Sequence, residues 1–383
     1  MEAQGNGLKF ELHEEAPRGT RFKVIGVGGG GSNAVGRMMS GGLEGVEFCV
    51  VNTDAQALRA SAVPYKLQIG EKLTRGLGAG ADPEIGRQAA LDDTERITEM
   101  LQDAEMVFLV AALGCGTGTG AAPVIATLAK GLGALTVAVV TMPFRFEGPR
   151  RMQNAERGLA ELAATVDAWV PLYNDRLLAL APPGISLGEA FRLADDVVRQ
   201  AVEGISDIIL RPGLINRDFA DLRATLQGMG FAVMGTAVAR GEKAALEAAR
   251  QAIRSPLIEE GGIAGAASVL VNITGSQALG LHDVSEACQF IREATGREDA
   301  VVNFGLALND AMGDAVKVTV IATGFSRETA PVGSPAPIAA VSRPEPGPAS
   351  RAEAPPVSPL EASLPEPEDL DVPAYLRQRK LIQ

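Results

Sequence analysis

Two glycine-rich stretches in the first third of the chain have the composition of phosphate-binding loops. They read Gly26-Val-Gly-Gly-Gly-Gly-Ser-Asn33 and Gly114-Cys-Gly-Thr-Gly-Thr-Gly120, and each follows an apolar run typical of a buried strand. Glycines tolerate positive φ and let bare backbone N–H groups approach an anion closely. Two such loops could hold one polyphosphate, and a third stretch of small residues, 76–83, could enclose it further.

The first loop also fits a different ligand. It satisfies the pattern Gly-x-Gly-x-x-Gly, and Asp54 follows the next predicted strand, as in dinucleotide-binding folds. A nicotinamide or flavin oxidoreductase is therefore an alternative, although it gives the second loop no role. The histidines available for acid–base chemistry are His13 and His282, which makes this the weaker hypothesis. No Walker lysine motif is present, which excludes an ordinary P-loop NTPase.

A cluster of acidic residues supplies candidate catalytic groups. Asp218 and Asp221 lie three residues apart, so they share one face of a helical start, and Asn216 precedes them. Carboxylates can orient water for attack on a phosphate. They also repel a triphosphate, and supplying them from a second subunit would avoid that cost. The structural alternative is a simple N-terminal helix cap.

The elements that would position these residues have an α/β pattern. Apolar runs at 22–27, 48–51, 106–113 and 135–141 predict buried strands, with helices between them, including one at 34–39 after the first loop. Such strands are typical of a parallel sheet covered on both faces. Apolar residues at helical spacing predict a long helix over 188–210. A second α/β unit follows, with strands at 231–235, 268–274, 300–308 and 315–323.

Composition then divides the chain into parts. Eleven of the 23 prolines fall between positions 331 and 367, which predicts a disordered, extended linker. We expect a flexible arm at 1–20, a nucleotide-binding domain at 21–187, a central helix at 188–212, a second domain at 213–326, the linker at 327–369 and a tail peptide at 370–383.

The net charge and the number of cysteines argue against some functions, such as nucleic-acid binding. The net charge is −12, and no basic cluster occurs before the extreme carboxyl terminus, which argues against nucleic-acid binding. Three separated cysteines and two histidines have no metal-ligand spacing, so no dedicated metal site is predicted, and they fit a reducing cytoplasm. The first twenty residues lack a signal peptide, and no apolar run is long enough to enter a membrane. We expect a soluble cytoplasmic protein.

Taken in order, several stretches resemble the FtsZ branch of the tubulin/FtsZ GTPase family, the bacterial relatives of tubulin. The resemblance covers nearly the whole chain. It implies a Rossmann-like GTP-binding domain with a parallel sheet, a central helix, a smaller α/β domain and a disordered tail. It also implies a GTPase that polymerises head-to-tail into the ring of bacterial cell division at midcell. The matching stretches are 23–28, 52–58, 76–80, 116–120, 146–148, 216–221 and 371–377.

Site residues carry over from the resemblance by position. In the family, the acidic loop, here Asn216, Asp218 and Asp221, completes the next subunit's site. Mg²⁺ is implied by triphosphate chemistry. Asp195 matches the guanine-reading position, and a carboxylate can accept from both N1–H and the 2-amino group of guanine. Phe191, one turn earlier, could stack on the base. The remaining residues implied to contact GTP or GDP are Gly29, Gly30, Gly31, Ser32, Asn33, Gly80, Ala81, Gly114, Gly116, Thr117, Gly118, Thr119, Glu147, Arg151 and Asn174.

The tail resembles the family's partner-binding peptide. It implies docking onto membrane-tethering and regulatory division proteins, with apolar side chains in a helix-in-groove contact. The residues concerned are Asp371, Val372, Pro373, Tyr375, Leu376 and Arg377.

Three positions depart from the family's usual residues, namely Cys115, Asp82 and Pro149. A side chain at Cys115 could crowd the phosphates, Asp82 could weaken GTP binding or help hold Mg²⁺, and Pro149 suits the first position of a helix. These departures leave a non-hydrolysing filament scaffold as a second alternative.

Overall fold

The structure is a computed structural model that describes residues 21–43, 45–178, 181–182, 184–210, 213–215, 218–258 and 261–325. For 213–215 it describes the backbone alone. The expected arm, the linker, the tail peptide and Asn216 lie outside these residues.

Six parallel strands form the first half of one continuous sheet, in the order β3-β2-β1-β4-β5-β6. This order reverses direction between β1 and β4, as in doubly wound folds. The expected α/β fold class is confirmed. The strands are β1 (Phe22–Val27), β2 (Val46–Asn52), β3 (Tyr65–Gln68), β4 (Met106–Ala112), β5 (Leu135–Met142) and β6 (Ala168–Tyr173).

The second half of the sheet is mixed and continues from β6 in the order β8-β11-β9-β10-β7. β8 joins β6 through a short parallel pairing of Ala168 with Gly230 and Trp169 with Phe231, and it pairs antiparallel with β11. The strands are β7 (Gly213–Ile215), β8 (Gly230–Arg240), β9 (Ser268–Gly275), β10 (Val301–Leu308) and β11 (Ala315–Thr323).

Helices cover both faces of the parallel strands. One face packs against α1 (Gly28–Ser40), α9 (Leu187–Leu210) and α10 (Phe219–Leu226). The other face packs against α4 (Pro83–Asp92), α5 (Thr94–Leu101), α6 (Gly116–Gly131) and α7 (Pro149–Ala163). Strand residues alternate between these two cores, as the pleat requires. The short helices α2 (Ala55–Ala60), α3 (Glu71–Thr74) and α8 (Asn174–Leu177) and the 3-10 turns η1 (Arg145–Glu147) and η2 (Asp310–Met312) complete the connections.

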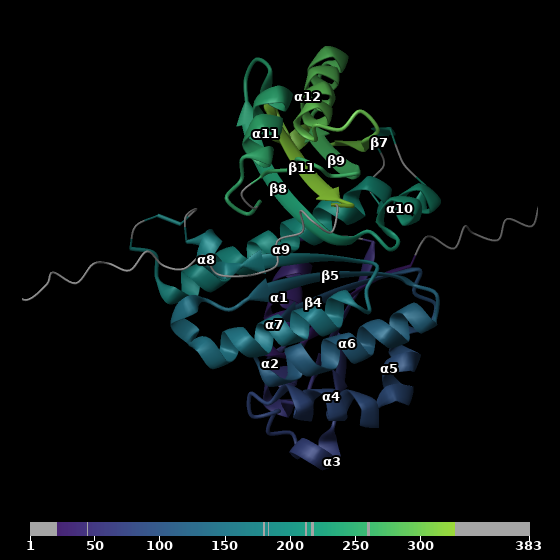
Figure 1. Cartoon of the computed structure of the whole chain (residues 1–383), viewed down its shortest axis with the longest axis vertical. Helices are drawn as coiled ribbons and strands as arrows, with labels where there is room; N and C mark the ends of the chain where they lie inside the picture. The colour runs from purple at the N-terminus through teal and green to yellow at the C-terminus, as the bar shows by residue number, and fades with distance from the viewer. Residues whose placement is uncertain are drawn as a thin grey trace, which may run out of the picture. The chain divides into compact units, whose positions relative to one another are not determined.

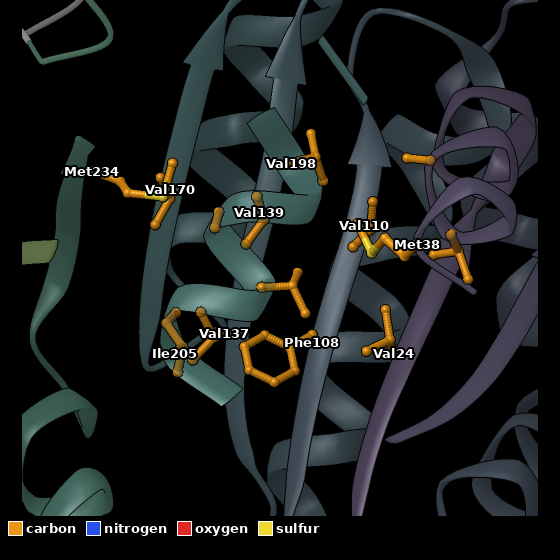
Figure 2. Packing of buried hydrophobic residues seen from close by; sticks show 14 of the residues in the cluster. Val24, Met38, Phe108, Val110, Val137, Val139, Val170, Val198, Ile205 and Met234 are labelled. Carbon is orange, nitrogen blue, oxygen red and sulfur yellow. The ribbon is translucent and has the colours of Figure 1, made fainter. Parts of the chain in front are cut away.

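The long helix α9 is shared by both halves of the sheet. Figure 1 shows it between the parallel strands and the group formed by β8, β9 and β11. Figure 2 shows Val198 and Ile205 of this helix beside Val137 and Val139 of β5, in the core that also contains Met234 of β8. The remaining helices, α11 (Ala244–Ile253) and α12 (Leu281–Ala294), cover the other face of the second half.

The described helices include none with both the length and the apolar character needed to cross a bilayer. The 24-residue helix α9 is long, but polar residues interrupt its apolar positions.

The expected elements are confirmed in outline, but several differ in extent or were missed, and the strand expected at 231–235 is the longer β8. Strands 22–27 and 315–323 match β1 and β11 at both ends. The strands β3, β6 and β7 were not expected, because they are short or carry a proline and polar residues. The helix predicted at 34–39 begins six residues earlier, so the glycines form its first turn instead of a preceding loop.

Gly235 marks a position where α11 meets β8 without room for a side chain. A methyl group there would lie 2.0 Å from the carbonyl oxygen of Ala252. We expect Gly235→Ala to lower the free energy of unfolding by at least about 2 kcal/mol, because backbone must move. Gly36→Ala, in open space inside α1, is the control and should be neutral or stabilising by up to about 1 kcal/mol. Urea unfolding followed by circular dichroism tests this, and equal midpoints for the two variants would contradict it.

Candidate functional site

The two phosphate-binding candidates lie together because β1 and β4 are neighbours. These strands pair in parallel from Phe22 with Met106 to Val27 with Ala111. Both therefore end at the same edge of the sheet, which we call the carboxyl edge. It is also the point where the strand order reverses, and ligands of such sheets bind at this point.

Direct contacts join all three small-residue stretches. A methyl group on Gly28, whose φ is 73°, would lie 2.8 Å from the backbone nitrogen of Gly118. One on Gly116 would lie 2.7 Å from the Cβ atom of Ala79 and 2.9 Å from the carbonyl oxygen of Asp82. These positions need glycine because the loops touch one another through their backbones.

The glycines form the first turns of two helices whose N-termini lack caps. Neither α1 nor α6 has a capping side-chain hydrogen bond or an acidic residue in its first turn. The unpaired N–H groups and the positive end of each helix dipole therefore favour an anion at the carboxyl edge. By contrast, Asp82 caps α4, and its Oδ1 accepts from the backbone N–H of Glu84 at 2.9 Å. Its carboxylate is thus engaged by its own helix.

Some of the candidate residues are exposed, so a ligand can reach them, and others are buried beneath them. Gly29, Gly30, Asn33, Gly80 and Ala81 are exposed, and Ala81 has a left-handed φ of 62°. A non-glycine residue in this conformation carries strain, which is common in functional loops. The other candidate glycines and threonines of the two main stretches are buried, namely Gly31, Gly114, Gly116, Thr117, Gly118 and Thr119.

Hydroxyl and amide groups add polar atoms at this edge. Thr119 Oγ1 accepts from the N–H of Gly114 at 2.9 Å, and Thr117 Oγ1 lies 2.7 Å from Thr53 Oγ1. Ser32 Oγ and Asn174 Oδ1 are buried and make no hydrogen bond within the described part of the chain. A buried polar atom without a partner is costly, so both suit a polar ligand.

The Glu147–Arg151 pair connects the end of β5 to the start of α6. Glu147 forms an ion pair with Arg151, and its Oε1 accepts from the N–H of Phe144 at 2.9 Å. Arg151 Nη2 donates to Cys115 Sγ, 2.7 Å away. Arg151 is therefore held at the second glycine stretch. Pro149 begins α7 as its sequence predicts.

Asp195 and Phe191 lie on one face of α9. Asp195 Oδ2 is 2.6 Å from Arg37 Nη1 of α1. Burial raises the pKa of Asp195 to about 6, against the opposing effect of Arg37. Phe191 is 39% exposed and packs edge-on against Phe144, with ring centroids 5.6 Å apart. An aromatic face and a carboxylate therefore stand one turn apart, as a base-binding site requires.

The acidic candidates lie at the other edge of the sheet. Asp218 and Asp221 are exposed at the start of α10, where Asp218 Oδ1 accepts from the N–H of Asp221 at 2.8 Å. In the same helix, Arg223 donates to the carbonyl oxygen of Gly133, which precedes β5, at 2.8 Å. Gly133 lies before the start of a strand, whereas the glycine stretches lie after the carboxyl ends of β1 and β4. A seven-residue strand such as β4 is about 20 Å long, so about this distance separates the two groups of candidates. Figure 1 shows α8 and α10 at opposite ends of α9.

Two residues of this region escaped the sequence analysis. Thr53 forms a hydrogen bond with Thr117, but the sequence marked it only as a member of the stretch 52–58 that resembles the family. Arg37 gave no signal, since its pairing with Asp195 depends on how α1 packs against α9. Asp54, the residue expected to bind ribose in a dinucleotide site, instead caps α2 by accepting from the N–H groups of Gln56 and Ala57. This weakens the oxidoreductase hypothesis.

The chain is similar to proteins of a known family. Residues 21–182 match the family model for the tubulin/FtsZ GTPase domain, and residues 230–326 match the FtsZ C-terminal domain. The cell division protein FtsZ of Pseudomonas putida is 51% identical over 316 residues, which are 82% of this chain and 79% of that protein.

Solved structures show the same fold. An empty FtsZ dimer from M. jannaschii has a TM-score of 0.75 and 40% identity, covering 80% of this chain and 88% of that one. CetZ2 from Haloferax volcanii, solved as a GTPγS-bound protofilament, shares the fold with a TM-score of 0.70 and 24% identity over 80% of this chain and 94% of that one. The chain therefore belongs to the FtsZ branch of the tubulin/FtsZ family, whose members are self-associating GTPases of cell division.

Proposed function

We propose that this chain binds GTP at its carboxyl edge and hydrolyses it where two subunits meet in a head-to-tail filament. One observation carries the proposal: the nucleotide-binding candidates and the acidic candidates lie at opposite edges of the same sheet. Asp218 cannot reach the glycine stretches of its own chain across about 20 Å of strand. A second subunit can bring the two edges together.

The phosphates would bind to the uncapped N-termini of α1 and α6. Gly29, Gly30 and Gly31 offer backbone N–H groups from one side, and Gly116–Thr119 offer them from the other. The stretch at Gly80 and Ala81 lies beside Gly116 through Ala79, where it can contact the terminal phosphate. Arg151, anchored by Glu147, adds a positive charge next to Cys115.

Asp195 would read the guanine base, and Phe191 would stack on it. Asp195 presents a carboxylate for the N1–H and 2-amino donors, whereas adenine lacks this pair of donors. The buried Oδ1 of Asn174, which has no hydrogen-bond partner among the described residues, supplies a further polar contact.

Hydrolysis would depend on Asp218 and Asp221 of the neighbouring subunit. Their carboxylates would orient water toward the terminal phosphate. A contact between two different surfaces of the same chain repeats without closing and so builds a filament. Assembly and hydrolysis would then be coupled, because each new junction completes one active site.

Mg²⁺ would accompany the triphosphate and neutralise part of its charge. The described residues contain no group of three or more histidine, cysteine or acidic side chains placed to hold a metal. We therefore assign its ligands mainly to phosphate oxygens and water.

The other expectations from the sequence and from the resemblance remain part of this proposal. They are the domain division at 21–187, 188–212 and 213–326, the cytoplasmic ring at midcell, and docking of partners on 370–383. Because α9 packs against both halves of the sheet, a separate central helix at the domain boundary is consistent with the core.

Phosphate release should depend steeply on protein concentration. We expect almost no activity below a threshold, followed by rising activity per subunit, with light scattering that decays as GTP is consumed. The physical reason is that an isolated subunit lacks the second edge. Activity per subunit that is constant from low concentration, without scattering, would contradict a site shared between subunits.

Asp218→Asn separates the charge of this residue from its role as a helix cap. Asparagine caps helices about as well as aspartate, so α10 should persist. We expect GTP binding and filaments to remain while hydrolysis slows at least about tenfold, equivalent to about 1.4 kcal/mol. Asp218→Ala should show the same loss and a small additional destabilisation. Normal turnover by Asp218→Asn would refute a catalytic carboxylate here and favour a structural cap.

Deleting residues 370–383 should leave assembly intact and abolish recruitment to the membrane. The reason is that the deleted peptide carries the apolar anchors expected to bind partners. Sedimentation with GTP measures assembly, and a fluorescent fusion in cells measures recruitment. Tyr375→Ala should reproduce the deletion, while Gln378→Ala should not. A truncated chain that still reaches midcell at the membrane would disprove this role.

A further inference from the structure

The ion pair between Arg37 of α1 and Asp195 of α9 suggests a role beyond holding two helices together. We propose that Arg37 is a positioning residue that keeps the Asp195 carboxylate ionised and oriented for guanine, and so determines base specificity. The inference rests on the proposed GTP site. It adds a residue that neither the sequence nor the resemblance indicated.

The geometry shows a partly buried carboxylate with a cation beside it. Asp195 Oδ2 lies 2.6 Å from Arg37 Nη1, and the side chains are 15% and 41% exposed, respectively. The Nη1 atom is buried and makes no hydrogen bond within the described part of the chain, so its contact with Asp195 is an ion pair. Arg37 thus approaches one oxygen of the carboxylate from the α1 side and leaves the other oxygen to a ligand.

The charged surroundings of Asp195 make this cation important. Burial raises the pKa of Asp195 to about 6, Arg37 lowers it, and Asp196 raises it. On α9 itself, Arg199 lies 3.6 Å from Asp196 and also binds the buried Glu203, so its charge is used elsewhere.

The charged residues of α8, which packs against α9, interact with residues other than Asp195. Arg176 lies over the ring of Tyr173, with the guanidinium carbon 4.9 Å from its centroid, and Asp175 pairs with Arg145 at 3.3 Å. Among the described contacts, the cation that faces Asp195 is Arg37.

Protonation of Asp195 would turn one of its hydrogen-bond acceptors into a donor facing the base. An ionised carboxylate has about four acceptor sites, enough for both guanine donors beside the Arg37 ion pair. A protonated carboxyl group presents a donor in place of one acceptor. Guanine would then meet a donor with a donor, so guanine recognition requires the ionised form that Arg37 favours.

Removing Arg37 should leave the packing of α1 against α9 intact. Val35 and Met38 of α1 and Val198 and Val202 of α9 are all buried in one apolar core, which does not depend on the charge of Arg37. Arg37→Met keeps an apolar stem of similar length while removing the charge. The variant therefore tests the charge more than the fold, and thermal unfolding confirms that it is folded.

The experiment compares GTP with ITP, which lacks the 2-amino group, on the full chain below its assembly concentration. Affinity is measured from pH 5.5 to 8.5, and the GTP-to-ITP ratio cancels titration of the shared triphosphate. The variants are Arg37→Met, Arg37→Lys and the control Arg297→Gln, which removes a surface partner of Asp299.

In the wild-type chain, the ratio should be constant above about pH 7 and fall as the pH drops through about 6, because Asp195 becomes protonated there. In Arg37→Met the fall should shift to higher pH, so the ratio at pH 7 drops at least about threefold and recovers by pH 8.5. Arg37→Lys should restore most of the wild-type profile, and Arg297→Gln all of it.

Two results would overturn the inference alone. One is an Arg37→Met profile that coincides with the wild type. The other is tighter GTP binding by Arg37→Met at every pH, which would mean that Arg37 competes with guanine for Asp195. A wild-type chain that fails to bind GTP, or that binds GTP and ITP equally at every pH, would instead overturn the guanine site and this inference with it.

Discussion

Parallel pairing of β1 with β4 is the interaction on which the rest of the structure depends. It places the ends of both strands side by side, and each strand leads directly into a helix that begins with glycines. Because α1 and α6 then start at adjacent points, their N-termini face a common space. Side chains larger than hydrogen at Gly28 or Gly116 would push these backbones apart.

The same parallel arrangement separates the two kinds of functional residue. Every strand of the first half runs in one direction, so residues before and after a strand lie at opposite edges of the sheet. The glycine stretches follow strands, whereas α10 packs near Phe22 and Gly133, at the starts of strands. In the function proposed above, this separation is the reason why a second subunit, added head-to-tail, completes the site.

The helix α9 connects these edges physically. It carries the base-binding candidates Phe191 and Asp195 near its beginning and leads to β7 and α10 at its end. Its buried face belongs to the same core as β5 of the first half and β8 of the second. Lys317 of β11 also lies 3.5 Å from the buried Glu203 of this helix. This helix therefore contacts both halves of the sheet and also carries the two base-binding candidates.

Apolar periodicity reports burial directly, so the residue pattern alone predicted the α/β class, most strands and the long helix. It also marked both glycine stretches and the acidic cluster by residue type. The residue pattern could not show that the glycines begin helices or that Arg37 pairs with Asp195. It also could not show that the carboxylates of Asp82 and Asp54 accept hydrogen bonds as helix caps. Those facts depend on which strands are neighbours and how α1 packs on α9. Such contacts join residues that are far apart along the chain, so they depend on tertiary packing and cannot be predicted from local spacing.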